Sequence, residues 1–363
     1  MIAEGESLHP ARYWHKIETN KIQCDLCPRA CKIKEGQRGF CFVRGNSGNQ
    51  LVLTTYGRSS GFCIDPIEKK PLNHFYPGSP ILSFGTAGCN LGCKFCQNWD
   101  ISRSKEFDRL CEPASPREIA LTAKSHHCKS VAFTYNDPVI FLEYAKDAAE
   151  ECHQEGIHTV AVTAGYIHGK GRDEFFSFID AANVDLKAFS QRFYKTLTGG
   201  DLQVVLDTLQ YIRAETRVWL EITTLLIPGE NDSEKEITDL SEWVFTHLGA
   251  DTPLHFSAFH PDFKMRHLPA TPVKTLAKAR KIAMRAGLNY VYTGNVYFAE
   301  GDTTFCPHCG QAVIQRDWYN LLAYELKPDG TCCFCQKPIA GFFDKKPGTW
   351  GSKRQPVRMI PAG

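Results

Sequence analysis

The sequence lacks any apolar run of about 18 residues, and this absence excludes a predicted membrane-spanning helix. It also lacks an excess of either charge, because 42 Lys and Arg are balanced by 40 Asp and Glu, for a net charge of +2. No nucleic acid and no anionic membrane are therefore expected as partners. The first residues, MIAEGESLHP, lack the basic and apolar pattern of a signal peptide. We expect a cytoplasmic protein.

Cysteine, by contrast, is abundant, with sixteen residues in the chain. In a cytoplasmic protein so many cysteines do not indicate structural disulfides. Eleven of them fall into three groups, which indicates three metal sites. The groups are Cys24, Cys27, Cys31 and Cys41; Cys89, Cys93 and Cys96; and Cys306, Cys309, Cys332 and Cys335.

The middle group has the spacing C-x3-C-x2-C and follows an apolar run, residues 81–87, that is typical of a buried strand. Three thiolates can hold a cube of four irons and leave one iron without a protein ligand. An open metal position can bind and activate a small molecule. The alternative is a zinc knuckle, which needs a fourth ligand and usually a C-x2-C spacing. We therefore predict a [4Fe–4S] cluster at Cys89, Cys93 and Cys96.

The two outer groups each contain four cysteines. In the N-terminal group the spacing is C-x2-C-x3-C-x9-C; structural zinc and an auxiliary iron–sulfur cluster both fit it, and our interpretation favours zinc. The C-terminal group consists of two C-x2-C pairs, typical of a zinc ribbon or a rubredoxin-like site for zinc or iron. Cys333 lies between two predicted ligands there and could replace one of them.

From residue 81 to 298, short apolar segments alternate with helical patterns, which predicts parallel βα units in a barrel or an open sheet. We predict helix caps at Asp201 and Asp232 and a capping box at residues 115–118. Strands are expected at 81–87, 130–134, 158–163, 183–187, 218–226, 254–259 and 290–293. The predicted organisation is an N-terminal extension at 1–80, a barrel at 81–298, a four-cysteine module at 299–343 and a solvated basic segment at 344–363.

The run Cys89-x3-Cys93-x-Phe95-Cys96, with the spacing C-x3-C-x2-C, resembles the signature of the radical S-adenosylmethionine (SAM) enzymes. The resemblance implies a partial (βα)6 barrel and a cluster whose open iron chelates the amino and carboxylate groups of SAM. It further implies reductive cleavage of SAM to methionine and a 5′-deoxyadenosyl radical, which abstracts hydrogen from a substrate. An electron donor such as flavodoxin or ferredoxin is then expected.

Reactive residues of βα barrels lie at the C-terminal ends of the strands, and these ends suggest a SAM pocket. Asp137 is either an ordinary helix cap before Pro138 or an acceptor for the SAM amino group. Asp185 and Lys187 share one strand face, as an internal ion pair or as contacts to the ribose and the carboxylate of SAM. The remaining predicted cofactor-binding residues are Phe95, Tyr135, Asn136 and Thr163. Glu221, His255 and His260 are available for a substrate, whereas His74 is expected to be packed or solvated.

Further segments, among them DPIEKKPLNHFYPGS, NVDLKAF, LLIPGENDS and HFSAFHPDFKM, resemble the AmmeMemoRadiSam-system radical SAM proteins, which are related to pyruvate formate-lyase activating enzymes. That resemblance implies association with AMMECR- and Memo-domain proteins. Asp137 and Ala164 depart from the family, which tends to have Glu and Asn. Three functions remain open: modification of a protein, as by an activase; modification of a small metabolite; and a zinc-binding scaffold without catalysis.

Overall fold

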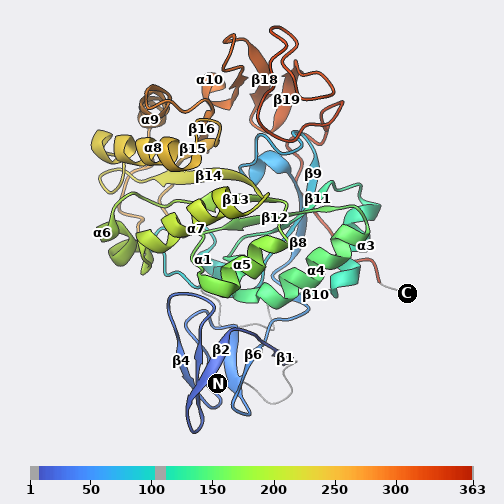
Figure 1. The fold of residues 1–363 in the computed structure, drawn as a ribbon, viewed down its shortest axis with the longest axis vertical. Helices are drawn as coiled ribbons and strands as arrows, with labels where there is room; N and C mark the ends of the chain where they lie inside the picture. The colour runs from blue at the N-terminus through green and yellow to red at the C-terminus, as the bar shows by residue number, and fades with distance from the viewer. Residues whose placement is uncertain (1–7, 103–111, 362–363) are drawn as a thin grey trace.

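The computed structural model describes residues 8–102 and 112–361. Its centre is an open sheet of nine strands in the order β16-β15-β14-β13-β12-β11-β9-β8-β20 (Figure 1). The seven strands from β9 to β16 are parallel neighbours in chain order, whereas β8 and β20 are antiparallel additions beyond β9. The bounds are β8 (Phe62–Pro66), β9 (Pro80–Phe84), β11 (Ser130–Phe133), β12 (His158–Thr163), β13 (Ala181–Asp185), β14 (Trp219–Leu226), β15 (Leu254–Ala258), β16 (Val291–Gly294) and β20 (Gln355–Pro356). All seven predicted strands are present, and the sheet forms a partial βα barrel. The strand expected at 183–187 ends at Asp185, however, so Lys187 lies two residues beyond it instead of on its face.

Helices connect the parallel strands and cover the outer face of the sheet. They are α3 (Pro116–Ser125), α4 (Leu142–Gln154), α5 (Gly169–Ser177), α7 (Leu202–Glu215), α8 (Glu234–Leu248) and α9 (Val273–Arg285), with shorter turns α1 (Trp99–Ser102), α6 (Gln191–Phe193) and α10 (Ala299–Asp302). No helix in residues 8–102 and 112–361 has the length and apolarity needed to cross a bilayer.

The predicted capping box and the cap at Asp201 are confirmed, because Ser115 accepts from the backbone N–H of Glu118 and Asp201 from that of Gln203. The cap predicted at Asp232 is wrong. Ser233 caps α8 instead and accepts from Glu236, while Asp232 accepts from Gly229 in the preceding turn. Both side chains can cap a helix, and the turn decides which of them lies at its first residue.

Residues 67–76 close the N-terminal end of the barrel, with η1 (Ile67–Lys69) at their start. Ile67, Leu72 and Phe75 pack in one cluster with residues of four parallel strands, namely Ile81, Ala132, Val160 and Ala181. Their backbone is held from inside the sheet, since Asn183 Nδ2 donates to Pro71 O at 2.8 Å. Pro71 lies within this segment and Pro66 and Pro77 flank it, which disfavours a longer helix or an inner strand here. The segment therefore fills this end of the barrel as an irregular plug.

The two four-cysteine modules lie at opposite ends of the molecule (Figure 1). The N-terminal module consists of two three-stranded sheets, and the C-terminal module of one. Their strands are β1 (His9–Pro10), β2 (Trp14–Glu18), β3 (Lys21–Cys24), β4 (Lys32–Lys34), β5 (Arg44–Ser47) and β6 (Gln50–Leu53); and β17 (Thr304–Phe305), β18 (Ala312–Asp317) and β19 (Asn320–Tyr324). The segment after the C-terminal module is more than a solvated tail: its basic side chains are exposed, but β20 pairs with β8.

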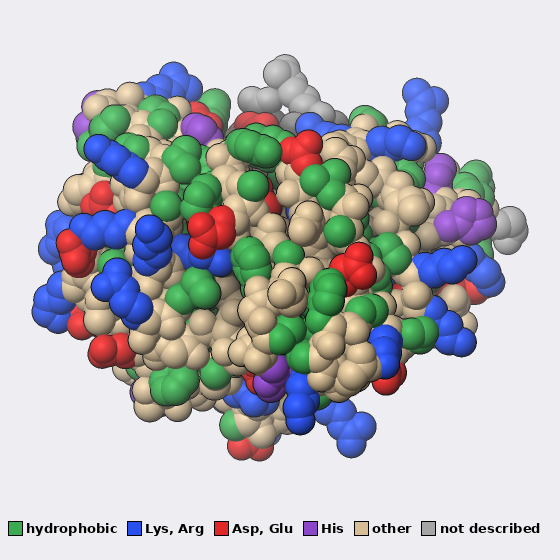
Figure 2. Space-filling model, turned by 90° about the horizontal axis from the view of Figure 1, so that it is seen from above, with side chains coloured by type: hydrophobic (Ala, Val, Ile, Leu, Met, Phe, Trp, Pro, Cys, Tyr) green, Lys and Arg blue, Asp and Glu red, His purple; other side chains and the backbone are tan. Residues whose placement is uncertain are grey.

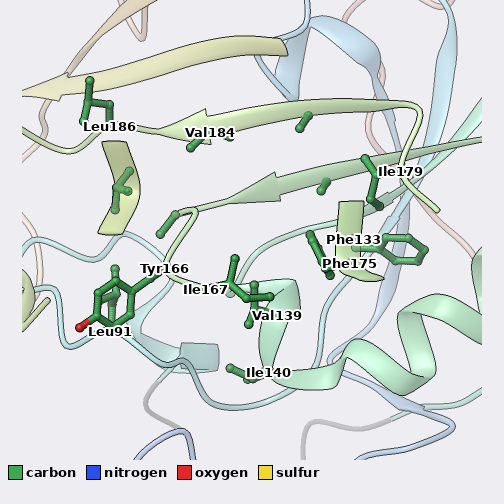
Figure 3. Close-up of a cluster of buried hydrophobic side chains, with 14 of the residues drawn as sticks. Leu91, Phe133, Val139, Ile140, Tyr166, Ile167, Phe175, Ile179, Val184 and Leu186 are labelled. Carbon is green, nitrogen blue, oxygen red and sulfur yellow. The ribbon is translucent and has the colours of Figure 1, made fainter. Parts of the chain in front are cut away.

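The main core lies between the sheet and its helices and extends into the N-terminal module. It includes Leu91 from the cysteine loop and Tyr166 from the end of β12, which lie together in Figure 3. A separate cluster joins Tyr290 and Tyr292, at the edge of the barrel, to the C-terminal module. The face in Figure 2 shows basic and acidic side chains interspersed.

Candidate active site

A cavity of about 290 Å³ opens at the C-terminal ends of the parallel strands. All ten residues predicted to hold the cluster or SAM line it. They are Cys89, Cys93, Phe95 and Cys96 from the cysteine loop, and Tyr135, Asn136, Asp137, Thr163, Asp185 and Lys187 from the ends of β11, β12 and β13. The parallel register brings these ends to one edge of the sheet, which explains why segments nearly 100 residues apart converge.

The loop Cys89–Cys96 is held by its own backbone. Gly92 N–H donates to Thr198 O at 2.7 Å and Lys94 N–H donates to Leu197 O at 2.8 Å, both in η3 (Tyr194–Thr198). Burial raises the pKa of Cys89 to about 11 and that of Cys93 to about 12. These thiols are therefore protonated at neutral pH unless a cation replaces the proton. Three half-buried thiols around one cavity fit an iron–sulfur cluster with an open position.

Asn136 supports the cysteine loop rather than facing a ligand freely. Its Nδ2 donates to Gly88 O at 2.8 Å, and its Oδ1 accepts from the backbone N–H of Thr86 at 3.3 Å. The approach is possible because residue 85 is glycine: a Cβ there would lie 2.2 Å from Thr134 O. Asn136 therefore fixes the backbone just before Cys89.

Asp137 performs the capping role expected of it and still faces the cavity. One carboxylate oxygen accepts from Val139 N–H at 3.2 Å and from Thr163 Oγ1 at 2.9 Å. Among the residues that the structure describes, the other accepts a single, long hydrogen bond of 3.3 Å, from the backbone N–H of Ala164. Burial raises the pKa of Asp137 to about 6, although these donors favour the charged form. The second oxygen retains accepting capacity for a cationic ligand.

Asp185 and Lys187 form an ion pair of 2.9 Å on the wall of the cavity. Burial opposes the charged ammonium, but the adjacent Asp185 carboxylate reverses that effect, and the pKa of Lys187 is raised. The lysine is therefore a permanent cation in this cavity. Both the internal ion pair and the ligand contact proposed from the sequence are compatible with this geometry.

The two aromatic residues differ in their surroundings. Phe95 is 4% exposed and its ring centroid lies 5.5 Å from that of Phe193, so it packs the cysteine loop onto the barrel. Tyr135 has a left-handed backbone with φ of 69°, and its hydroxyl donates to Asp65 at 3.1 Å. Tyr135 therefore lines the cavity while its polar end points to an ion pair between Asp65 and Lys70.

Sequence reasoning missed lining residues on the last strands, chiefly Thr223, Ser257 and Asn295. Thr223 is buried, and its Oγ1 has no hydrogen-bond partner among the described residues. Strand alternation could have indicated Thr223 and Ser257, since each lies two residues beyond a side chain, Glu221 or His255, that faces the barrel interior.

The residues suggested for a substrate have different positions. Glu221 is fully buried below the cavity and accepts four hydrogen bonds, from the backbone N–H groups of Asn73 and His74, from Trp219 and from His255. It anchors the segment that closes the barrel. His260 is exposed and outside the cavity lining.

His74 is packed, as expected. It is fully buried; its Nδ1 lies 2.6 Å from Ala340 O and its Nε2 lies 2.5 Å from Tyr292 Oη. Nδ1 must donate to the carbonyl, so Nε2 accepts from the tyrosine.

A second cavity of about 100 Å³ shares Pro71, Ser257 and Asn295 with the first. It lies between the barrel and the C-terminal module. Its polar lining includes His255, Asp302 and Arg316, with Trp318 and Tyr319 from the turn between β18 and β19.

The C-terminal cysteines form a compact group. Their ligand atoms all lie within 4.8 Å of one another, with Sγ–Sγ distances of 3.6 Å between Cys306 and Cys335 and 3.8 Å between Cys309 and Cys332. Zn–S bonds of about 2.3 Å in a tetrahedron place sulfurs about 3.8 Å apart, so the group fits one metal ion. Cys333 is exposed and outside the group.

Comparison with known proteins agrees with this geometry. The sequence profile of the Radical SAM superfamily matches residues 84–241, which contain the cysteine loop and strands β11 to β14. An uncharacterised protein of Methanocaldococcus jannaschii is 38% identical over 326 residues, covering 90% of this chain and 97% of that protein. The chain belongs to the radical SAM superfamily.

Other relatives of this radical SAM enzyme are activating enzymes. The 4-hydroxyphenylacetate decarboxylase activating enzyme of Clostridioides difficile is 24% identical over 243 residues, 64% of this chain and 74% of that protein. The pyruvate formate-lyase-activating enzyme of Clostridium pasteurianum is 25% identical over 211 residues, 53% and 86% of the two chains. A solved domain of such an enzyme from Bacteroides vulgatus has a TM-score of 0.41 and 20% identity, covering 46% of this chain and 99% of that domain.

Proposed function

We propose that this radical SAM enzyme holds a [4Fe–4S] cluster on Cys89, Cys93 and Cys96, binds SAM beside it and abstracts hydrogen from a protein substrate, as activating enzymes do. The supporting observation is that three cysteines and the charged pair of Asp185 and Lys187 line one cavity. When bound, the reduced cluster supplies the electron that splits SAM into methionine and a 5′-deoxyadenosyl radical.

The side chains of the cavity match the groups of SAM. Lys187 is a permanent cation and would pair with the carboxylate of the methionine part. Asp137 has a carboxylate oxygen that can accept from the ammonium, and Asp185 can accept from the ribose hydroxyls. Val162 and Leu225 supply apolar surface that limits water in the same cavity.

The assignment is tested by SAM binding and cleavage in the anaerobically reconstituted protein. Lys187→Ala should weaken SAM affinity about tenfold to a hundredfold, since a charge-assisted contact contributes ~1.5–3 kcal/mol. Lys195→Ala, an exposed lysine on η3, is the matched control and should bind as wild type does. Replacing Cys89, Cys93 and Cys96 by Ala should abolish SAM cleavage. Wild-type affinity in Lys187→Ala with normal cluster loading would show that the lysine serves only its ion pair.

The protein substrate and the partners are part of the proposal. We expect AMMECR- and Memo-domain proteins to be partners, a flavodoxin or ferredoxin to be the reductant, and the cytoplasm to be the site of action. Formation of 5′-deoxyadenosine should rise above its basal rate when purified AMMECR- or Memo-domain protein is added with the reductant. An unchanged rate with both proteins would contradict this choice of partners.

A small metabolite is the second candidate substrate. The observation that favours it is the polar cavity of about 100 Å³ beside the SAM cavity, since a small polar molecule would fit a site of that size. A rise in 5′-deoxyadenosine with a protein-free extract, and none with the proteins, would favour the metabolite.

A further inference from the structure

The N-terminal cysteines surround a cavity instead of meeting one another. Cys24, Cys27, Cys31 and Cys41 all line it, and the rest of its wall comes from Leu26, Arg29, Ile33, Gly39, Arg44, Asn90, Val139 and Ile140. The cavity is small, about 20 Å³, but protein interiors are close-packed, so a gap bordered by four thiols is a candidate position for a group that these thiols bind.

The separation of the sulfurs distinguishes the candidate groups. Within residues 8–102 and 112–361, only the C-terminal cysteines form a set of three or more potential ligands whose atoms all lie within 4.8 Å. The four N-terminal sulfurs are therefore too dispersed for the tetrahedron of about 3.8 Å edges that a single zinc ion requires. Cys89, Cys93 and Cys96 are dispersed in the same way around their own cavity. A cube places four irons between its thiolates and needs this wider arrangement.

We propose that Cys24, Cys27, Cys31 and Cys41 hold a second [4Fe–4S] cluster, directly against the cysteine loop of the active site. This site goes beyond the proposed function, because SAM cleavage requires only the cluster on the central loop. The spacing of the cysteines in sequence fits both zinc and a cluster, and our interpretation of the sequence favoured zinc; the arrangement of their sulfurs favours the cluster.

The surroundings of the cavity suit an anionic cluster. Arg44 is 2% exposed and pairs with Glu143, and its Nε donates to Ile140 O at 2.9 Å. The guanidinium offsets thiolate charge that burial would otherwise penalise. The backbone N–H of Phe40 lies 3.5 Å from Cys31 Sγ and donates to it, as amides around iron–sulfur clusters do.

The second site also contacts both neighbours of Cys89. A Cβ on Gly88 would lie 2.0 Å from the carbonyl oxygen of Cys41, so only glycine permits this approach. On the other side, Asn90 lines the N-terminal cavity, and its carbonyl accepts a hydrogen bond from Arg29 Nε. Loss of the N-terminal site should therefore disturb the loop that carries Cys89.

Metal counting on the full-length protein tests the proposal. After anaerobic reconstitution with iron, sulfide and zinc, the wild type should hold about eight irons, four for each cube. Cys27→Ala with Cys31→Ala should remove at least the four irons of the N-terminal site, and more where the loop that carries Cys89 is disturbed, and should leave zinc unchanged. Cys128→Ala with Cys152→Ala, two buried cysteines outside the three groups, is the matched control and should keep all the iron. Loss of zinc instead of iron, or no loss of either, would overturn the proposal.

A second variant keeps the test decisive if the N-terminal double variant does not fold. Replacing Cys89, Cys93 and Cys96 by Ala removes the central cluster and leaves the N-terminal cysteines intact. That protein should retain about four irons with the Mössbauer spectrum of a [4Fe–4S] cluster. An iron-free triple variant with wild-type circular dichroism would overturn the second cluster.

Discussion

The two ends of the molecule each contain four cysteines, yet the sulfurs are arranged differently. In the C-terminal module two C-x2-C pairs meet face to face, with sulfurs 3.6 Å and 3.8 Å apart. In the N-terminal module the cysteines are spread around a cavity that also touches the barrel. Equal numbers of ligands therefore do not imply equal metals, because the packing around the ligands sets the size of the site.

The modules also differ in what they support. The C-terminal module packs on Tyr290 and Tyr292, at the edge strand and away from the cysteine loop. The N-terminal module contacts the residues on either side of Cys89. Loss of the C-terminal metal should therefore have a local effect, whereas loss of the N-terminal site should reach the active site.

The largest expected effect is loss of the C-terminal metal. Cys306→Ser with Cys309→Ser should unfold this module, because a structural metal contributes of the order of 10 kcal/mol to the folding of a small module. Limited proteolysis should then cleave within residues 304–343, while the iron content stays at the wild-type value. Cys333→Ser is the matched control and should change neither measurement. Full zinc content and protease resistance in the double variant would contradict the assignment.

The next effect concerns the contact between the N-terminal module and the cysteine loop. Gly88→Ala should cost more than ~2 kcal/mol, since a Cβ would collide with Cys41 and φ is 86°. Iron content should fall while zinc content is unchanged. Gly36→Ala is the control: its φ of 72° is similarly strained, but no atom lies within 4 Å of the added carbon. Equal iron loss in both variants would mean that backbone strain, not the contact, is responsible.

The smallest expected effect is a loss of stability in acid at His74, which joins the barrel to the C-terminal module. Burial lowers the pKa of His74 from 6.5 to about 4, so the folded state resists protonation that the unfolded state accepts. The contribution of neutral His74 to the free energy of unfolding is fully present above pH 6.5 and is lost as the pH falls from 6.5 towards 4. At pH 5.5 the resulting loss of folding stability is of the order of 1 kcal/mol.

His74→Gln should remove this pH dependence, because glutamine donates and accepts without titrating. Urea unfolding at pH 7.5 and 5.5 measures the difference. The exposed His267→Gln is the control and should keep the wild-type pH response. If the free energy of unfolding of His74→Gln falls between pH 7.5 and 5.5 as much as that of the wild type does, another group causes the acid sensitivity.

Much of the fold and the site could be read from the sequence. The seven strands have short apolar patterns, and the strand-end rule correctly placed residues such as Asp137 and Lys187 in one cavity. Strand alternation indicates which face Thr223 occupies, but that this face borders the cavity depends on the neighbouring strands. From its chemistry and strand position Glu221 is available for a substrate, but in the structure it binds the backbone of Asn73 and His74.

The sequence by itself determined the cysteine loop, the order of βα units and membership in the radical SAM superfamily. These features depend on the local spacing of the cysteines and on the periodicity of apolar residues along the chain. Only the tertiary structure decided that residues 67–76 close the barrel, that His74 joins it to the C-terminal module and that Gly88 meets Cys41. It also decided the separation of the N-terminal sulfurs. These features join segments far apart in the chain, and close packing in three dimensions, which no local pattern encodes, sets their distances.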